Sequence, residues 1–183
     1  MAVEDEATAA VSPAVQIRFA TPSDAEAIAL LSQELLAFYG LPVRYQRSYM
    51  AHVIAEKAFT EPPSIEILMA FERGQARGFL AFSSSFAVAN CQTSVFIQDL
   101  FVTRKARAHG IGRQLMTEMA RLCVERGIGQ LDWTADPWNE KATAFYEAMG
   151  PLLRSDKTYY RLLSPRLVDL AAGTQPAERR LRT

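Results

Sequence analysis

The sequence predicts an α/β (α+β) protein whose mixed, mostly antiparallel central sheet of six to seven strands is flanked by helices. Three observations predict this fold class. Segments of strand and helix type follow the order β-α-α-β-β-β-α-β-α-β, and the first strand segment, VQIRFA, alternates apolar and polar residues. In addition, a glycine-rich turn joins a long apolar strand to an amphipathic helix. This order is typical of a sheet with helices packed on its faces.

Length and composition indicate an ordinary globular protein. The chain has 183 residues, and its basic and acidic side chains are equal in number at 20 each. Balanced charge gives no general affinity for polyanions, so nucleic acid is not an expected partner. Cys91 and Cys123 show neither a disulfide framework nor metal-type spacing, so no metal is expected. The acidic start does not resemble a signal peptide and no apolar run approaches membrane-spanning length, so we expect a cytoplasmic protein without a membrane partner.

The domain boundaries follow from the two ends of the chain. Residues 15–163 are expected to form a single domain, with residues 1–14 as a flexible arm and residues 164–183 as a C-terminal tail. Within the tail, RLVDLAA at residues 166–172 could form a short helix.

The first half of the chain predicts a strand, two helices and a hairpin. VQIRFA at residues 15–20 alternates as a strand does. Thr21 is expected to cap the next helix, with Pro22 at its first position and Gly40 at its end. A second helix is expected at residues 44–59, followed by a hairpin that turns at RGQ.

The second half predicts a long strand at residues 93–103, a helix at 110–126, a strand at 129–135, a helix at 139–150 and a last strand at 157–163. The helix at 110–126 has its apolar residues on one face: Ile111, Leu115, Met119 and Leu122.

The glycine-rich turn lies between the long strand and the helix at 110–126. The first N–H groups of a helix have no intrahelical partner, and the helix dipole favours negative charge there, so the turn predicts an anion site. The P-loop pattern fails because no Gly-Lys-Ser/Thr closes the loop, and the dinucleotide pattern fails at its third glycine, where Leu115 stands. The pattern R-x-x-G-x-G, from Arg107 to Gly112, remains. Alone it fits either a pyrophosphate site or a tight loop leading into a core helix.

From this turn onward the chain resembles the GNAT superfamily of acyl-CoA-dependent N-acetyltransferases. The match runs through QDLFVTRKARAHGIGRQLM, GQLDWTA and WNEKATAFYEAMG, and two motifs in this order are more specific than either alone. Within the superfamily, the stretch from Asp99 to Val102, the GIG turn, WNE and the opening IRFATPSDAEAI resemble the diamine and spermidine/spermine N-acetyltransferase group. The resemblance implies a GNAT-like acyl-CoA N-acyltransferase fold with acetyl-CoA as cosubstrate.

The resemblance also implies which residues bind the cofactor. The backbone of the strand end would polarise the acetyl carbonyl and pair with the pantetheine arm, and the glycine turn would hold the pyrophosphate. The implied residues are Leu100, Phe101 and Val102 on the strand, Arg107, Ala108, His109, Gly110, Ile111, Gly112 and Arg113 at the turn, and Asn139 and Ala142 on the next helix. By residue type alone, Asn139 could instead be only a helix cap, and His109 an exposed loop residue.

Tyr146 is implied as the general acid that protonates the departing CoA thiolate. A phenol suits this role because its unperturbed pKa of ~10 lies above that of a thiol at ~8.5. Without the resemblance, Tyr146 beside Phe145 on an amphipathic helix is typical of a half-buried core aromatic. Trp138 is a candidate for lining the acyl channel.

The amine side departs from the resembled group. Gln98 stands where that group has a glutamate, Thr158 replaces a second acid, and the acids after the first helix are missing. Asp99, with Asp132 or Asp136, would have to attract the amine, and the general base is not identified. The expected substrate-binding residues are Gln98, Asp99, Asp132, Trp133 and Thr134.

The sequence therefore predicts an N-acetyltransferase that moves an acetyl group from acetyl-CoA to a primary amine of a small molecule by direct attack in a ternary complex. The shortage of carboxylates favours a small, amino-acid-like amine whose carboxylate would pair with Arg44, Arg47 or Lys157. Two alternatives stay open: a catalytically weak CoA-binding sensor or scaffold of the same fold, and a peptide or protein N-acetyltransferase. Dimers are common in the resembled group, so a homodimer is expected.

Overall fold

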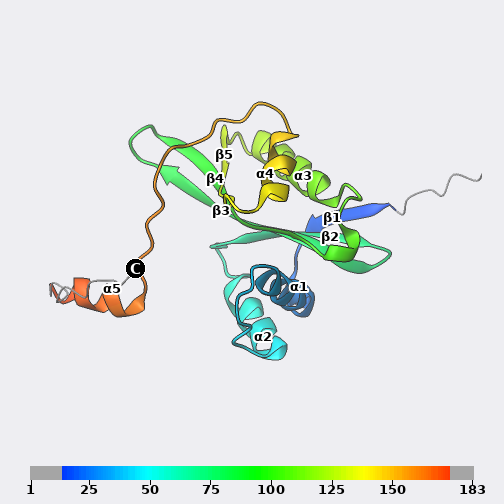
Figure 1. Cartoon of the computed structure of the whole chain (residues 1–183), viewed down its shortest axis with the longest axis horizontal. Coiled ribbons are helices and arrows are strands. Elements are labelled where there is room, and N and C mark those ends of the chain that lie inside the picture. Colours follow the sequence, from blue (N-terminus) through cyan, green and yellow to red (C-terminus); the bar gives the residue numbers. More distant parts are fainter. Residues whose placement is uncertain (1–13, 174–183) are drawn as a thin grey trace, which may run out of the picture. The chain divides into compact units, whose positions relative to one another are not determined.

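The computed structural model of the chain describes residues 14–173 (Figure 1). These residues form two compact units that divide between Asp136 and Pro137, and each unit is described by itself. Except for Ala14, the arm expected at residues 1–14 lies outside the described residues, and the tail is described only over residues 164–173. Within the described part of the chain, no helix has the length and apolar content needed to cross a membrane.

The first unit is built on a five-stranded sheet in the order β1-β2-β3-β4-β5. The strands are β1 (Val15–Phe19), β2 (Glu66–Glu72), β3 (Gln75–Ala87), β4 (Gln92–Val102) and β5 (Gln130–Trp133). Neighbouring strands are antiparallel except β4 and β5, which are parallel. The mixed, mostly antiparallel sheet expected from the sequence is confirmed, with five strands in place of six or seven.

Helices cover both faces of this sheet (Figure 1). Helices α1 (Ala25–Phe38) and α2 (Arg47–Lys57) lie on one face, and α3 (Ile111–Glu125) lies on the other. The α1 face buries an apolar cluster made of Ile28, Leu31, Ile67, Met69, Phe79, Ala81 and Phe101. The apolar face predicted for α3 is buried as expected, at Ile111, Leu115, Met119 and Leu122.

Helix α1 begins later than its sequence signals indicate. Thr21 precedes a short 3-10 turn, Pro22–Asp24, and the α-helix starts at Ala25. The Asp24 carboxylate accepts the Thr21 backbone N–H at 2.8 Å and two N–H groups of the Arg18 guanidinium at 2.7 and 2.8 Å. The hydrogen bonds from Arg18 are the main reason why the pKa of Asp24 is lowered to about 2. This ion pair fixes the path of the chain from β1 into α1.

The predicted hairpin forms between β2 and β3. It turns at Arg73 and Gly74, whose φ angles are 51° and 72°. Further along β3, Gly78 pairs with Val102 of β4. A Cβ atom at Gly78 would lie 2.5 Å from the backbone oxygen of Phe101. Only glycine therefore allows β4 to approach β3 this closely near its end.

The second unit contains α4 (Glu140–Glu147) and α5 (Ser164–Ala171), and α5 agrees with the short helix considered for the tail. The strand predicted at residues 157–163 is wrong, because residues 151–163 have no regular secondary structure. A strand needs a neighbour for its backbone hydrogen bonds, and among the described residues no strand pairs with this segment. The apolar side chains of this segment remain exposed, with relative exposures of 104% at Leu153 and 87% at Tyr160.

Candidate active site

Strand β4 contains one extra residue at Gln98. Ile97 and Asp99 pair with two consecutive residues of β3, so Gln98 has no partner there. Such a β-bulge bends the strand and changes the relation between residue number and sheet face. Ile97 and Phe101 are both buried, but only Phe101 belongs to the cluster beneath α1. Asp99, two residues before Phe101, therefore lies on the α1 face of the sheet.

The pairing of β4 with β5 ends earlier than its pairing with β3. β5 follows β4 only as far as Ile97, whereas β3 follows it to Val102. The Thr103 N–H donates to the Arg77 carbonyl of β3 at 2.8 Å. Along an antiparallel pair, residues that bond to the neighbouring strand alternate with residues that do not. The backbone N–H and C=O groups of Leu100 and Val102 therefore point away from β3. No strand of the described residues pairs with them on that side. We call Leu100–Val102 the open strip; apart from the Val102 carbonyl, which accepts the Arg107 Nε–H, its edge can pair with an extended ligand as an added strand.

The loop between β4 and α3 (residues 103–110, the β4–α3 loop) leads to the start of a 15-residue helix. Gly110 caps α3 with a φ of +80°, and Ala108 has a φ of 64°, which is unfavourable for a residue with a side chain. A Cβ atom at Gly110 would have only the Gln114 Nε2 atom within 4 Å, at 3.9 Å. The backbone at the helix start is therefore uncrowded and suits an anion.

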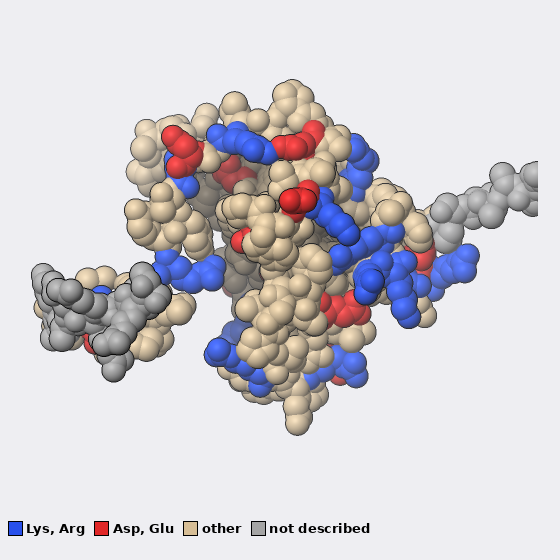
Figure 2. Space-filling model, viewed as in Figure 1, with Lys and Arg blue, Asp and Glu red and all other residues tan. Residues whose placement is uncertain are grey.

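The β4–α3 loop and the first turn of α3 carry only positive formal charge. Arg104, Lys105, Arg107 and Arg113 lie in this stretch, and it contains no Asp or Glu. In Figure 2, Lys and Arg side chains gather over this part of the first unit. Because positive charge adds to the effect of the helix dipole, the residues present fit the pyrophosphate that the resemblance implies.

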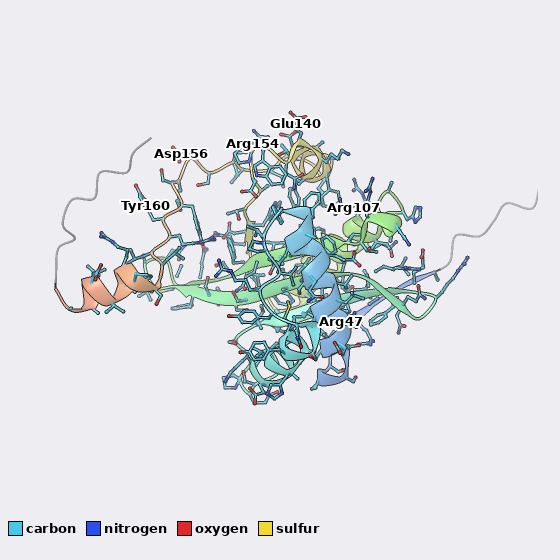
Figure 3. The ribbon with its side chains drawn as sticks, turned by 60° about the horizontal axis from the view of Figure 1, so that its bottom comes forward. Arg47, Arg107, Glu140, Arg154, Asp156 and Tyr160 are labelled. Carbon is cyan, nitrogen blue, oxygen red and sulfur yellow. The ribbon has the colours of Figure 1, made fainter. Side chains whose placement is uncertain are left out.

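Arg107 makes its contacts within the protein. Its Nε donates a hydrogen bond to the Val102 carbonyl at 2.9 Å. Its guanidinium carbon lies 4.6 Å from the centre of the Phe38 ring and 5.6 Å from that of Phe101. Figure 3 shows Arg107 beside the C-terminal end of α1. The structure therefore places Arg107 at the junction of the loop, the open strip and α1.

Glu34 and Phe38 of α1 were missed by the sequence analysis. The Thr103 hydroxyl donates to the Glu34 carboxylate at 2.6 Å, so Glu34, like Phe38, contacts the β4–α3 loop. The two residues are four positions apart and lie on one side of the helix. That spacing was visible in the sequence, but the partner of this helix side was not.

The residues expected to bind the amine on β4 lie next to each other at the bulge. The Gln98 side-chain N–H donates to the Ser83 hydroxyl at 3.2 Å, on the neighbouring strand. Asp99 keeps an exposed surface, yet the surrounding protein desolvates it enough to raise the pKa of its carboxyl group. A raised pKa makes this carboxylate a better proton acceptor than an ordinary aspartate.

The residues expected to bind substrate on β5 are divided between the faces of the sheet. Trp133 pairs with Ile97 and shares its face, whereas Asp132, one residue earlier, lies on the opposite face together with Asp99. Thr134 follows the end of the strand. Of these three residues, Asp132 is the one on the same face as the bulge carboxylate.

The remaining predicted residues belong to the second unit. Asn139 caps α4, since its side-chain oxygen accepts the Ala142 backbone N–H at 3.2 Å. Tyr146 is half-buried on α4, with its ring centre 5.2 Å from that of Phe145. The cap role of Asn139 is confirmed, and the roles of Asn139, Ala142 and Tyr146 toward a cofactor stay predictions.

A cavity of about 320 Å³ lies elsewhere in the first unit. It is lined by the end of β1, the start of β2 and the segment after α2, including Phe19, Phe59 and Ile67. None of the predicted site residues lines this cavity, so we place the candidate site at the open strip and the start of α3.

An open strip of sheet edge next to a basic helix start defines a class of proteins that bind an extended ligand with an anionic group. Comparison with known proteins then identifies the class. The model of the acetyltransferase (GNAT) family matches residues 28–150, and the chain belongs to this family. The chain is therefore an N-acetyltransferase by family, which confirms the resemblance at the superfamily level.

Individual relatives agree with this assignment. The chain is 33% identical over 73 residues to L-ornithine N5-acetyltransferase NATA1 of Arabidopsis thaliana, a match that covers 40% of this chain and only 32% of that protein. It is 26% identical over 157 residues to D-amino-acid N-acetyltransferase HPA3 of Saccharomyces cerevisiae, covering 82% of this chain and 92% of that protein. Among solved structures, an integron cassette protein from the mobile metagenome of V. cholerae matches with 28% identity and a TM-score of 0.78, covering 88% of this chain and 98% of that one.

Proposed function

We propose that the chain transfers an acetyl group from acetyl-CoA to a primary amine of a small molecule, by direct attack of the amine in a ternary complex. The observation that supports this proposal best is the open strip of β4 beside the basic start of α3. Acetyl-CoA has an extended pantetheine arm and a pyrophosphate. The open strip suits the first, and the uncrowded backbone at Gly110 suits the second.

Each residue would have a defined task. When bound, acetyl-CoA would supply the acetyl group as a thioester. The backbone N–H groups of Leu100 and Val102 would hold the arm and polarise the carbonyl, and their fixed place in the sheet avoids rearrangement during the reaction. The N–H groups from Ala108 to Arg113 would hold the pyrophosphate. Tyr146 would provide the proton that the departing thiolate takes up.

Asp99 is our candidate for accepting a proton from the amine. An alkylammonium group has an ordinary pKa of ~10.4, so the amine must lose a proton before it can attack. The raised pKa of Asp99 makes it more suitable for this step than a fully solvated carboxylate. Gln98 cannot hold a proton, but its amide can orient the amine or a water molecule.

We propose an amino-acid-like acceptor in preference to a long polyamine. Residues 35–55 contain no acid, whereas Arg44 and Arg47 lie there. A polyamine would lack the charge-assisted hydrogen bonds that carboxylates provide, each worth about 1.5–3 kcal/mol. Arg44, Arg47 or Lys157 would instead pair with a carboxylate of the acceptor, although Arg47 already lies 3.6 Å from Glu26.

The names of two relatives support this acceptor class. One is an L-ornithine N5-acetyltransferase and the other a D-amino-acid N-acetyltransferase. Each name places the transferred group on an amine of an amino acid. The resemblance to the diamine and spermidine/spermine group supports transfer to a terminal primary amine of this kind.

An acceptor panel tests the proposal. A thermal unfolding scan should first show a higher Tm with acetyl-CoA, because a ligand of the native state stabilises it. CoA thiol release should then give a higher kcat/KM for ornithine, lysine or a D-amino acid than for spermidine.

Other outcomes would separate the alternatives. Stabilisation by acetyl-CoA without thiol release from any acceptor would favour the CoA-binding sensor. A clear preference for spermidine would contradict the acceptor class, and a preference for peptides would favour the peptide N-acetyltransferase. The homodimer stays a prediction, which light scattering tests.

A further inference from the structure

The side chain of Arg107 joins three parts of the first unit. Its Nε bonds to the carbonyl of Val102 at 2.9 Å, at the end of the open strip. Its guanidinium faces the ring of Phe38 at 4.6 Å and that of Phe101 at 5.6 Å. Phe38 is the last residue of α1, and the segment that follows, residues 39–46, leads to α2. One side chain therefore connects the β4–α3 loop, the open strip and the end of α1 (Figure 3).

A second link connects the same loop and helix. The Thr103 hydroxyl donates to Glu34 at 2.6 Å, one helical turn before Phe38. Two links on one side of α1 fix both the distance and the rotation of its last turn relative to the loop. The start of the segment at residues 39–46 is therefore set by contacts with the β4–α3 loop.

We propose that Arg107 is a positioning residue that ties the β4–α3 loop to the end of α1, so that the acceptor side of the site depends on the loop that holds the cofactor. This inference rests on the proposed function, in which Arg44 of residues 39–46 is a candidate partner of the acceptor. It changes the role of Arg107 from a ligand of the pyrophosphate to a link between the two substrates.

The chemistry of arginine fits this role better than that of lysine. The Nε–H lies in the plane of the guanidinium and donates to a carbonyl, while the flat faces of the group stack on aromatic rings. A lysine would keep the positive charge near the phosphate site but has neither the Nε–H nor the flat group. Arg107→Lys therefore separates charge from positioning.

Hydrogen exchange tests the link without requiring turnover. In the cofactor-free protein, Arg107→Lys should speed amide exchange in residues 39–46. Phe38→Leu should have the same effect, whereas Phe38→Tyr, which keeps the ring, should behave as the wild type. Arg104→Lys is the matched control, because Arg104 lies in the same loop and, among the described residues, its side chain makes no hydrogen bond, ion pair or cation–π contact with α1. It should leave exchange in residues 39–46 unchanged.

Kinetics add a second readout. Arg107→Lys should raise the KM of the acceptor about tenfold while the Kd of acetyl-CoA changes less than about threefold. Arg107→Lys combined with Phe38→Leu should be no worse than either change alone, because both break the same contact.

Two results would overturn the inference. One is a raised acetyl-CoA Kd with acceptor KM and exchange of residues 39–46 unchanged, which would make Arg107 a phosphate ligand. The other is full additivity of the two changes. A protein that neither binds acetyl-CoA nor releases thiol would contradict the proposed function instead, and the exchange comparison in the cofactor-free protein would still decide whether Arg107 holds α1.

Discussion

Gly78→Ala tests how accurately the end of β4 must be placed. An alanine Cβ would stand 2.5 Å from the Phe101 backbone oxygen and 3.2 Å from Cγ2 of Val102. In folded proteins, a Cβ atom essentially never lies within 3.0 Å of a heavy atom outside its own residue and the two adjacent residues. The two strands must therefore separate by at least about half an ångström, the difference between 2.5 and 3.0 Å. Since the clash is with backbone, no side-chain rotation can relieve it.

The separation should affect stability and activity to different extents. Overpacking of this kind costs about 1–3 kcal/mol of unfolding free energy, which leaves most domains folded. A misplacement of about 1 Å can cost about 10²-fold in rate, so half that distance should cost about tenfold. We expect kcat/KM for acetyl transfer to fall by this factor, because the shift moves the backbone of Leu100 and Val102.

Two measurements check this prediction. Urea unfolding gives the change in unfolding free energy, and CoA thiol release at a temperature where the variant is folded gives kcat/KM. Gly129→Ala is the matched control, since no atom lies within 4 Å of a Cβ there and its φ is not positive. A destabilised but folded Gly78→Ala with wild-type kcat/KM would refute the argument that the placement of the open strip matters.

Three further predictions follow from the site. Gly110→Val should abolish acetyl-CoA binding in a folded protein. Gly74→Val is the control for backbone strain, because Gly74 has a φ of 72° and no atom lies within 4 Å of a Cβ there. Equal Tm shifts with acetyl-CoA in both variants would contradict a role of Gly110 in binding. Tyr146→Phe should lower kcat by about 10²-fold and leave the acetyl-CoA Kd unchanged, and wild-type turnover would remove Tyr146 from the mechanism. The pKa of Asp99 is raised in the folded state, so its ionisation lowers the unfolding free energy as pH rises above about 4. Asp99→Asn lacks this ionisation, and urea unfolding should therefore show it gaining stability relative to wild type between about pH 4 and pH 7. A constant difference over that range would show that Asp99 is not desolvated.

Local patterns predicted the elements whose partners are close in the sequence. The β2–β3 hairpin and the apolar face of α3 were predicted because turn residues and helical spacing determine them locally. The bulge at Gln98 was not, since it depends on how β4 aligns with β3 and on the burial of Phe101 beneath α1. The strand predicted at residues 157–163 was wrong for a related reason, because its pattern did not indicate a neighbouring strand.

The candidate site was predictable where the backbone forms it. The glycine turn indicated an anion site, and the positive φ at Gly110 agrees with an unusual backbone there. The contacts of Arg107 were not predictable, because Phe38 lies far from it in the sequence and their contact exists only after α1 packs on the sheet. Side-chain contacts of this kind depend on tertiary packing, which no motif of a few residues describes.

The bulge at Gln98 also bears on how the sequence of this chain can change over time. Asp99 and Ile97 pair with consecutive residues of β3, so loss of the single residue between them would leave every other β4 side chain on its present face. It would remove the bend that a bulge gives a strand, and the pairing of β4 with β5 could then extend beyond Ile97 and cover the open strip. The open strip is in this sense a consequence of the number of residues in β4. Exchanges of one side chain for another at this position should be tolerated far better than a deletion of one residue.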